Sequence, residues 1–172
     1  MNFFNKLLSN QVSLNAKVKT WSCNIFMLSS EEIKEMLGAD IIIEPYADEA
    51  LGPSGYDMAL AFDLVIPPLS WTLASTRERI ELSNSVSASI YMRSSLAREG
   101  LIGSFALIDP GFKGNLTISL FNASDKEIKL RAGERTVQVA FFRLGKPTLR
   151  PYSGKYQNSM GVVKSKREVI SN

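Results

Sequence analysis

The sequence predicts a mainly β protein with a distorted β-barrel or jelly-roll-like fold and one or two short helices. After residue 40 the chain consists largely of short stretches rich in branched and aromatic residues, which favour strands. Turn-forming residues separate these stretches at regular intervals, a spacing typical of barrels and jelly rolls. The 172 residues, of which 45% are hydrophobic, suffice for a single domain with its own core.

A short helix is predicted before the first strand. Ser29 followed by Glu32 is a capping-box pattern, and Gly38 stands where a helix would stop. The pattern therefore predicts a helix over residues 30–37.

The predicted strands follow in chain order, with turn signals such as Asp109-Pro110-Gly111 between them. The strand candidates are residues 41–43, 56–66, 71–75, 79–82, 86–92, 105–108, 116–121, 127–130 and 136–142.

Both ends of the chain differ from this β-rich middle. Residues 1–26 show no clean periodicity, and we interpret them as an N-terminal extension. Residues 27–172 are interpreted as a single domain. Its C-terminal tail, from about residue 151, holds Gly, Ser, Lys and Asn and is predicted to be mobile.

Composition excludes several kinds of catalytic site. The chain has no histidine and one cysteine, Cys23, so a zinc deaminase site with His and Cys ligands cannot be built. Ser-His-Asp and Cys-His nucleophilic sites are excluded for the same reason. Chemistry must therefore rest on carboxylates, hydroxyls, Lys and Arg, together with a hard metal ion such as Mg²⁺.

Charge and hydropathy indicate the class of partner and the compartment. The formal net charge is +3, and charges of both signs alternate, as in Arg77-Glu78-Arg79. This balance suits a small anionic ligand, and no basic stripe interleaved with aromatic residues indicates nucleic-acid binding. A single cysteine, no secretory signal and no apolar run of roughly 20 residues predict a cytoplasmic protein without a membrane span.

Five short motifs stand in a fixed order along the chain. They are Gly55-Tyr56-Asp57, Arg93-Ser94-Ser95-Leu96-Ala97-Arg98, Ile108-Asp109-Pro110-Gly111-Phe112-Lys113-Gly114, Gly133-Glu134-Arg135-Thr136-Val137-Gln138 and Gly154-Lys155-Tyr156-Gln157-Asn158. Each motif alone is a weak signal. Together they resemble the five motifs of the dUTPase superfamily, and the resemblance runs over residues 27–166. The opening segment, residues 27–57, looks like the dCTP deaminase branch of that superfamily.

The resemblance implies the dUTPase fold, a homotrimer with sites at the subunit interfaces, and hydrolysis of dUTP to dUMP and pyrophosphate with Mg²⁺. Asp109 would be the base that activates water, Gln138 would help hold that water, and Asp57 would contact Mg²⁺. The substrate-binding residues would be Arg93, Ser94, Ser95 and Arg98 on the phosphates, Tyr152 and Lys155 from the tail, Phe112 on the deoxyribose, and main-chain groups around Ile118 and Ser119 on the uracil. An ordinary carboxylate is ionised at neutral pH and can act as such a base.

One position separates the two branches of the superfamily. Ser119 stands where the resemblance places a proton-transferring glutamate in the non-zinc dCTP deaminases. Deamination needs a proton-transferring group, and a serine supplies neither the acidity nor the basicity. Phe105 and Leu107 also depart from the residues that many deaminases carry. The sequence therefore predicts a dUTP pyrophosphatase.

Two alternatives remain open from the sequence. One is dCTP deamination, alone or coupled to dUTP hydrolysis. The other is a non-catalytic nucleotide-binding relative, against which the presence of Asp57, Asp109 and Gln138 argues.

Overall fold

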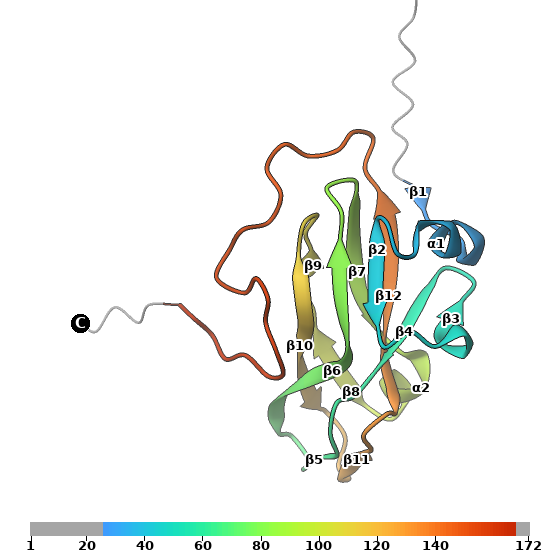
Figure 1. Ribbon diagram of the computed structural model, residues 1–172. Coiled ribbons are helices and arrows are strands. Elements are labelled where there is room, and N and C mark those ends of the chain that lie inside the picture. Colours follow the sequence, from blue (N-terminus) through green and yellow to red (C-terminus); the bar gives the residue numbers. More distant parts are fainter. Residues whose placement is uncertain (1–25, 168–172) are drawn as a thin grey trace, which may run out of the picture.

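The computed structural model describes residues 26–167 and confirms the mainly β prediction, with few and short helices (Figure 1). Residues 1–25, which are all but the last residue of the predicted N-terminal extension and include Cys23, lie outside the described residues. The elements are β1 (Phe26–Met27), α1 (Ser30–Met36), β2 (Ile41–Glu44), the 3-10 helix η2 (Asp48–Ala50), β3 (Leu51–Gly52), β4 (Gly55–Ala59), β5 (Leu64–Ile66), β6 (Trp71–Leu82), β7 (Val86–Met92), α2 (Ser94–Arg98), β8 (Leu101–Ser104), β9 (Leu107–Ile108), β10 (Lys113–Asn122), β11 (Ile128–Leu130) and β12 (Arg135–Arg143).

The strands form three sheets that share one core. The largest sheet has the order β3-β4-β12-β7-β9, with β1 also paired to β12. A second sheet has the order β2-β6-β10-β8, and β11 pairs with β5. Every second residue of β10 is buried, as expected for a strand with one face on the core. Ile118 from β10 and Phe141 from β12 both belong to the hydrophobic core, so the two large sheets pack against a common interior.

The predicted capping box is present at α1. The Ser29 hydroxyl accepts from the Glu32 amide over 3.3 Å, and the Glu32 carboxylate accepts from the Ser29 amide over 2.8 Å. The helix ends at Met36, one residue before the predicted boundary. Gly38 follows with a φ of +79°, a conformation that glycine adopts at little cost.

Four strand predictions were wrong in detail. Residues 56–66 form two strands, because the loop between β4 and β5 is tied elsewhere: the Asp63 carboxylate accepts from the Ala132 amide over 2.8 Å. The candidates 71–75 and 79–82 are one continuous strand, β6. The candidate 105–108 is strand only at β9.

The sequence did not indicate β8, which precedes that candidate. Phe105 turns inward over Gly103, where an added Cβ would lie 1.8 Å from the ring. The chain therefore leaves the ladder between β8 and β9.

Within the described residues, no helix has the length and apolar character needed to span a membrane.

Candidate functional site

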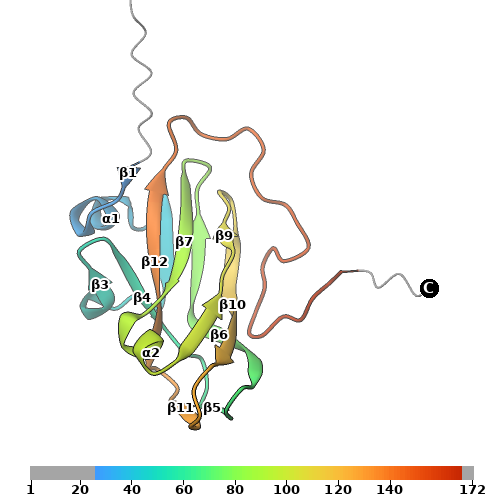
Figure 2. The same ribbon diagram turned by 180° about the vertical axis from the view of Figure 1, so that it is seen from behind.

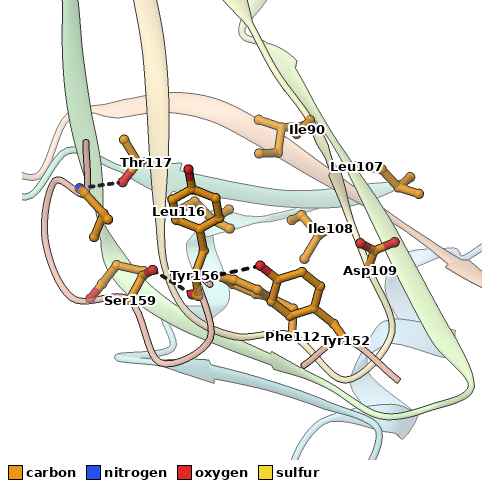
Figure 3. A pocket seen from close by; sticks show the side chains of 13 residues that line it. Ile90, Leu107, Ile108, Asp109, Phe112, Leu116, Thr117, Tyr152, Tyr156 and Ser159 are labelled. Atoms are coloured by element: carbon orange, nitrogen blue, oxygen red, sulfur yellow. Dashed lines mark hydrogen bonds between the residues drawn. The ribbon is translucent and has the colours of Figure 1, made fainter. Parts of the chain in front are cut away.

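A cavity of about 400 Å³ lies between β9, β10 and the C-terminal tail (Figure 3). Its lining residues are Ile90, Ala106, Leu107, Ile108, Asp109, Phe112, Asn115, Leu116, Thr117, Tyr152, Tyr156, Ser159 and Val163. Asp109 follows β9 directly and is exposed in the Pro-Gly turn. The rings of Phe112 and Tyr152 meet edge to face with centroids 5.7 Å apart. One carboxylate and a pair of aromatic rings thus face a space that suits a small molecule.

The cavity opens where two strands of one sheet separate. Strand β8 pairs with β10 from Leu101 opposite Asn122 to Ser104 opposite Ser119, and the chain then departs towards β9. We call this opening the fork; its arms are residues 105–109 and 115–118. The Ser104–Ser119 pair closes its inner end, and Asp109 lies at the far end of one arm.

The edge of β10 inside the fork is open. The tail pairs with β10 only near Gly114, where the Asn115 amide donates to the Ser159 carbonyl over 2.9 Å. Strand β8 takes over at Ser119. Residues 116–118 therefore have no strand partner on this edge within the part of the chain that the structure describes. The main-chain groups that face this edge could bind the edge of a planar ring, the role predicted for this segment.

The tail lies beside β9 and β10, on the side of the fold opposite α2 (Figures 1 and 2). The Tyr152 amide donates to the Pro110 carbonyl over 2.8 Å, and the Val163 amide donates to Thr117 Oγ1 over 3.0 Å. The Gln157 side chain bonds both the Gly111 carbonyl and the Lys113 amide. These bonds place tail residues over the cavity; the mobility predicted for the tail stays a prediction.

The two tail residues predicted to bind substrate lie in different surroundings. Tyr152 lines the cavity, but Lys155 is exposed and its Nζ donates to the Lys166 carbonyl over 3.3 Å. Tyr156 also lines the cavity. It belongs to the fifth motif, but the sequence predicted no substrate-binding role for it. Ile90 and Val163 carried no sequence signal, because an apolar residue in a strand or tail looks like any other.

A second cluster surrounds Asp57 on β4. Asp57 lies beside Gln138 on the neighbouring strand β12. Arg93, directly before α2, pairs its Nε with Asp57 Oδ2 over 3.0 Å and donates from Nη1 to the Arg135 carbonyl over 3.2 Å. Gly55 leaves room for this arrangement, since a Cβ there would lie 2.6 Å from the Val139 carbonyl oxygen and 3.2 Å from Gln138 Cγ.

Exposed polar side chains extend this cluster. Ser94, Ser95 and Arg98 belong to α2 and are exposed to solvent. Together with Arg93 they offer hydroxyl and guanidinium donors, which bind phosphate oxygens well. The cluster thus suits an anion, whereas the cavity at the fork suits a ring and a sugar.

The donor set of this cluster can be tested against Mg²⁺. Among residues 26–167 no three His, Cys, Asp or Glu side chains lie close enough to hold a metal ion together. Asp57 is a single carboxylate with a side chain 16% exposed. Mg²⁺ commonly keeps several waters and is bound by one or two carboxylates plus substrate phosphates. The residues therefore fit an ion that arrives with a triphosphate.

One chain does not bring the cavity and the Asp57 cluster together. Gln138 is on β12 and Ile108 ends β9, and β7 lies between these two strands. On β7, the residue opposite Gln138 is Tyr91 and the residue opposite Ile108 is Ala88, so the two positions also differ along the strand direction. Asp109, one residue beyond Ile108, is four residues from Gln138 along the strand direction, and at the usual strand spacing and rise the two residues are about 17 Å apart. That both hold one water stays a prediction, and it requires Asp109 of one subunit to meet Gln138 of another.

Comparison with known proteins identifies the family. A dCTP deaminase-like family model matches residues 61–144. The dCTP deaminase of Thermococcus kodakarensis is 46% identical over 144 residues, which is 75% of this chain and 93% of that protein. The chain belongs to the dCTP deaminase-like family. A protein of Sulfolobus islandicus rod-shaped virus 1, named "probable deoxyuridine 5'-triphosphate nucleotidohydrolase", is 32% identical over 158 residues, 83% of this chain and 99% of that protein.

Solved structures confirm the fold of this family member. The dUTPase of EIAV superposes with a TM-score of 0.52 at 22% identity, covering 67% of this chain and 97% of that one. The dCTP deaminase of Agrobacterium tumefaciens gives 0.61 at 18% identity, covering 70% of this chain and 47% of that one. The family resemblance and the dUTPase fold predicted from the sequence are both confirmed. The names of these relatives place the family in deoxynucleoside triphosphate metabolism.

Proposed function

We propose that this family member hydrolyses dUTP to dUMP and pyrophosphate. The observation that carries the proposal is the chemistry at the inner end of the fork. Ser119 stands there, and its hydroxyl accepts from the indole nitrogen of Trp71 over 2.6 Å. The titratable residues among those lining the cavity are Asp109, Tyr152 and Tyr156. No carboxylate of the described lining residues thus lies at the inner end.

Asp109 stands at the opposite end of the fork, which suits attack at a phosphate rather than at the base. A ring inserted towards Ser119 would be followed by the sugar near Phe112 and the α-phosphate near the open end. There the Asp109 carboxylate would accept the proton of a water whose oxygen attacks the α-phosphorus. The bond from the α-phosphorus to the oxygen bridging to the β-phosphate would break, and pyrophosphate would leave.

The phosphates need cationic partners that the cavity itself does not supply. The side chains suited to that task are Arg93, Ser94, Ser95 and Arg98. They follow β7 at the end of that strand, whereas Asp109 lies near its beginning. We infer that a second copy of the chain brings its Asp57 cluster, with Gln138, to the open end of the fork. Such a head-to-tail contact closes when the subunits form a ring, and a homotrimer is the assembly we propose.

Mg²⁺ is the proposed cofactor, and Asp57 is the residue that would hold it, through metal-bound water. When bound, the ion would neutralise charge on the triphosphate during bond breakage. Arg93 now pairs with Asp57. The arrival of phosphates would offer the guanidinium a competing anion, which would free the carboxylate.

Deamination of dCTP is the second candidate, and the relatives favour it. Six proteins that are 42–46% identical to the chain are named dCTP deaminases. On similarity alone, this supports deamination better than hydrolysis. The site chemistry favours hydrolysis, because water attack on cytosine needs a proton-transferring group at the ring, where this chain has Ser119.

Ammonia release separates the two reactions. We expect no detectable ammonia from dCTP with Mg²⁺ under conditions in which dUTP yields pyrophosphate. Asp109 is too far along the arm to serve the ring, and Ser119 cannot take its place. Ammonia release at a rate comparable to dUTP hydrolysis would overturn the proposal in favour of deamination. If neither nucleotide reacts, the chain would instead be a non-catalytic relative.

A further inference from the structure

The indole of Trp71 is held on the outer face of β10 by a short hydrogen bond. Its Nε1 donates to Ser119 Oγ over 2.6 Å, although 62% of Trp71 is exposed. An exposed tryptophan outside the core contributes little packing energy. The hydrogen bond to Ser119 is therefore the interaction that holds the Trp71 side chain in this position.

Ser119 occupies a particular place in the cavity's surroundings. It forms, with Ser104, the last pair of the β8–β10 ladder before the fork opens. Thr117, two residues earlier on the same face of β10, lines the cavity. A ring that enters the fork edge-on along residues 116–118 would have its leading edge at Ser119.

The hydroxyl groups of Thr117 and Ser119 differ in the hydrogen bonds that they can still make to a ligand. Thr117 Oγ1 accepts from the Val163 amide over 3.0 Å and donates to the Gly161 carbonyl over 3.4 Å. Ser119 Oγ accepts from Trp71, whose indole is a donor only. Among the described residues, the Ser119 hydroxyl hydrogen has no acceptor. Its proton is available to a ligand, whereas that of Thr117 is already engaged.

We propose that Trp71 is a positioning residue that makes Ser119 a hydrogen-bond donor and thereby sets the base preference of the site. The inference rests on the proposed function, since it names the base that the same cavity reads. Uracil presents a carbonyl acceptor at ring position 4, which the Ser119 hydroxyl can meet. Cytosine presents an amino donor there, and one of the two lone pairs of the Ser119 oxygen is already taken by the indole. The pair therefore favours uracil over cytosine.

Binding of two monophosphates tests this directly, because neither requires turnover. The probes are dUMP and dCMP, titrated calorimetrically into the full-length protein. We expect the wild type to prefer dUMP, and Trp71→Phe, which keeps a ring but loses the donor, to lower that preference on the order of fivefold, the scale of one net hydrogen bond. Ser119→Ala should lower it at least as much. The double variant Trp71→Phe/Ser119→Ala should fall no further than Ser119→Ala, because both changes remove one interaction.

Ser119→Thr, which keeps the hydroxyl, should retain most of the preference. Equal weakening of dUMP and dCMP in Trp71→Phe would show a merely structural role and overturn the inference. So would additive effects in the double variant, or a wild type that prefers dCMP. Turnover of dUTP is measured separately. A wild type that binds dUMP selectively but does not hydrolyse dUTP would leave this inference standing while the proposed function fails.

Discussion

Replacement of Asp109 by asparagine is expected to lower the rate of dUTP hydrolysis by roughly 10²–10⁴, the usual scale of general-base catalysis. Asparagine has nearly the same shape but cannot accept the proton of the attacking water. Asp109 is exposed in its turn, so the substitution removes a base and little packing. Steady-state kinetics of pyrophosphate release measure the effect.

The same substitution at another exposed aspartate is the matched control. Asp125 lies exposed in the turn after β10, away from the fork. Asp125→Asn should therefore keep the wild-type rate. dUMP affinity should change little in Asp109→Asn, because uracil and sugar contacts are untouched. A near-wild-type rate for Asp109→Asn would contradict the assignment of the base.

Mixing two inactive variants should restore activity, because the proposed site combines the cavity of one subunit with the Asp57 cluster of another. Asp109→Asn disables the cavity side, and Gln138→Ala disables the cluster side. After subunit exchange in an equal mixture, about a quarter of the sites would combine two intact halves. The mixture should then show about a quarter of wild-type activity, far above either variant alone.

The activity of the mixture distinguishes a site shared between subunits from a site within one chain. If Asp109 and Gln138 of one chain formed the site, every site in the mixture would still contain one defect and activity would stay at the level of the parents. A sample of Asp109→Asn alone, taken through the same subunit-exchange procedure, shows whether that procedure itself changes the activity. Recovery confined to the mixed sample would support a site shared between subunits.

Local features of the fold could be predicted from the sequence. The capping box of α1 depends on Ser29 and Glu32, which are close in the chain. The strand candidate 116–121 lies within β10, because its branched and aromatic residues stand close together in the chain. Such features are set by neighbours within a few residues, so a pattern suffices to predict them.

Features that depend on strand order could not be predicted. Asp57 and Gln138 become neighbours only because β4 pairs with β12, and nothing in either motif indicates that pairing. The ion pair from Arg93 to Asp57 and the bond from Trp71 to Ser119 likewise join segments far apart in the chain. The resemblance named the residues of the site and implied that it lies between subunits, and the strand order shows how one chain holds these residues in two separate places.

Product analysis of dUTP tests the central claim most directly. The full-length protein is incubated with dUTP and Mg²⁺, and the nucleotides and pyrophosphate are separated and quantified over time. We predict dUMP and pyrophosphate in equal amounts, without accumulation of dUDP, because water attacks the α-phosphorus. Unchanged dUTP, in a preparation that converts dCTP to dUTP and ammonia, would contradict the account.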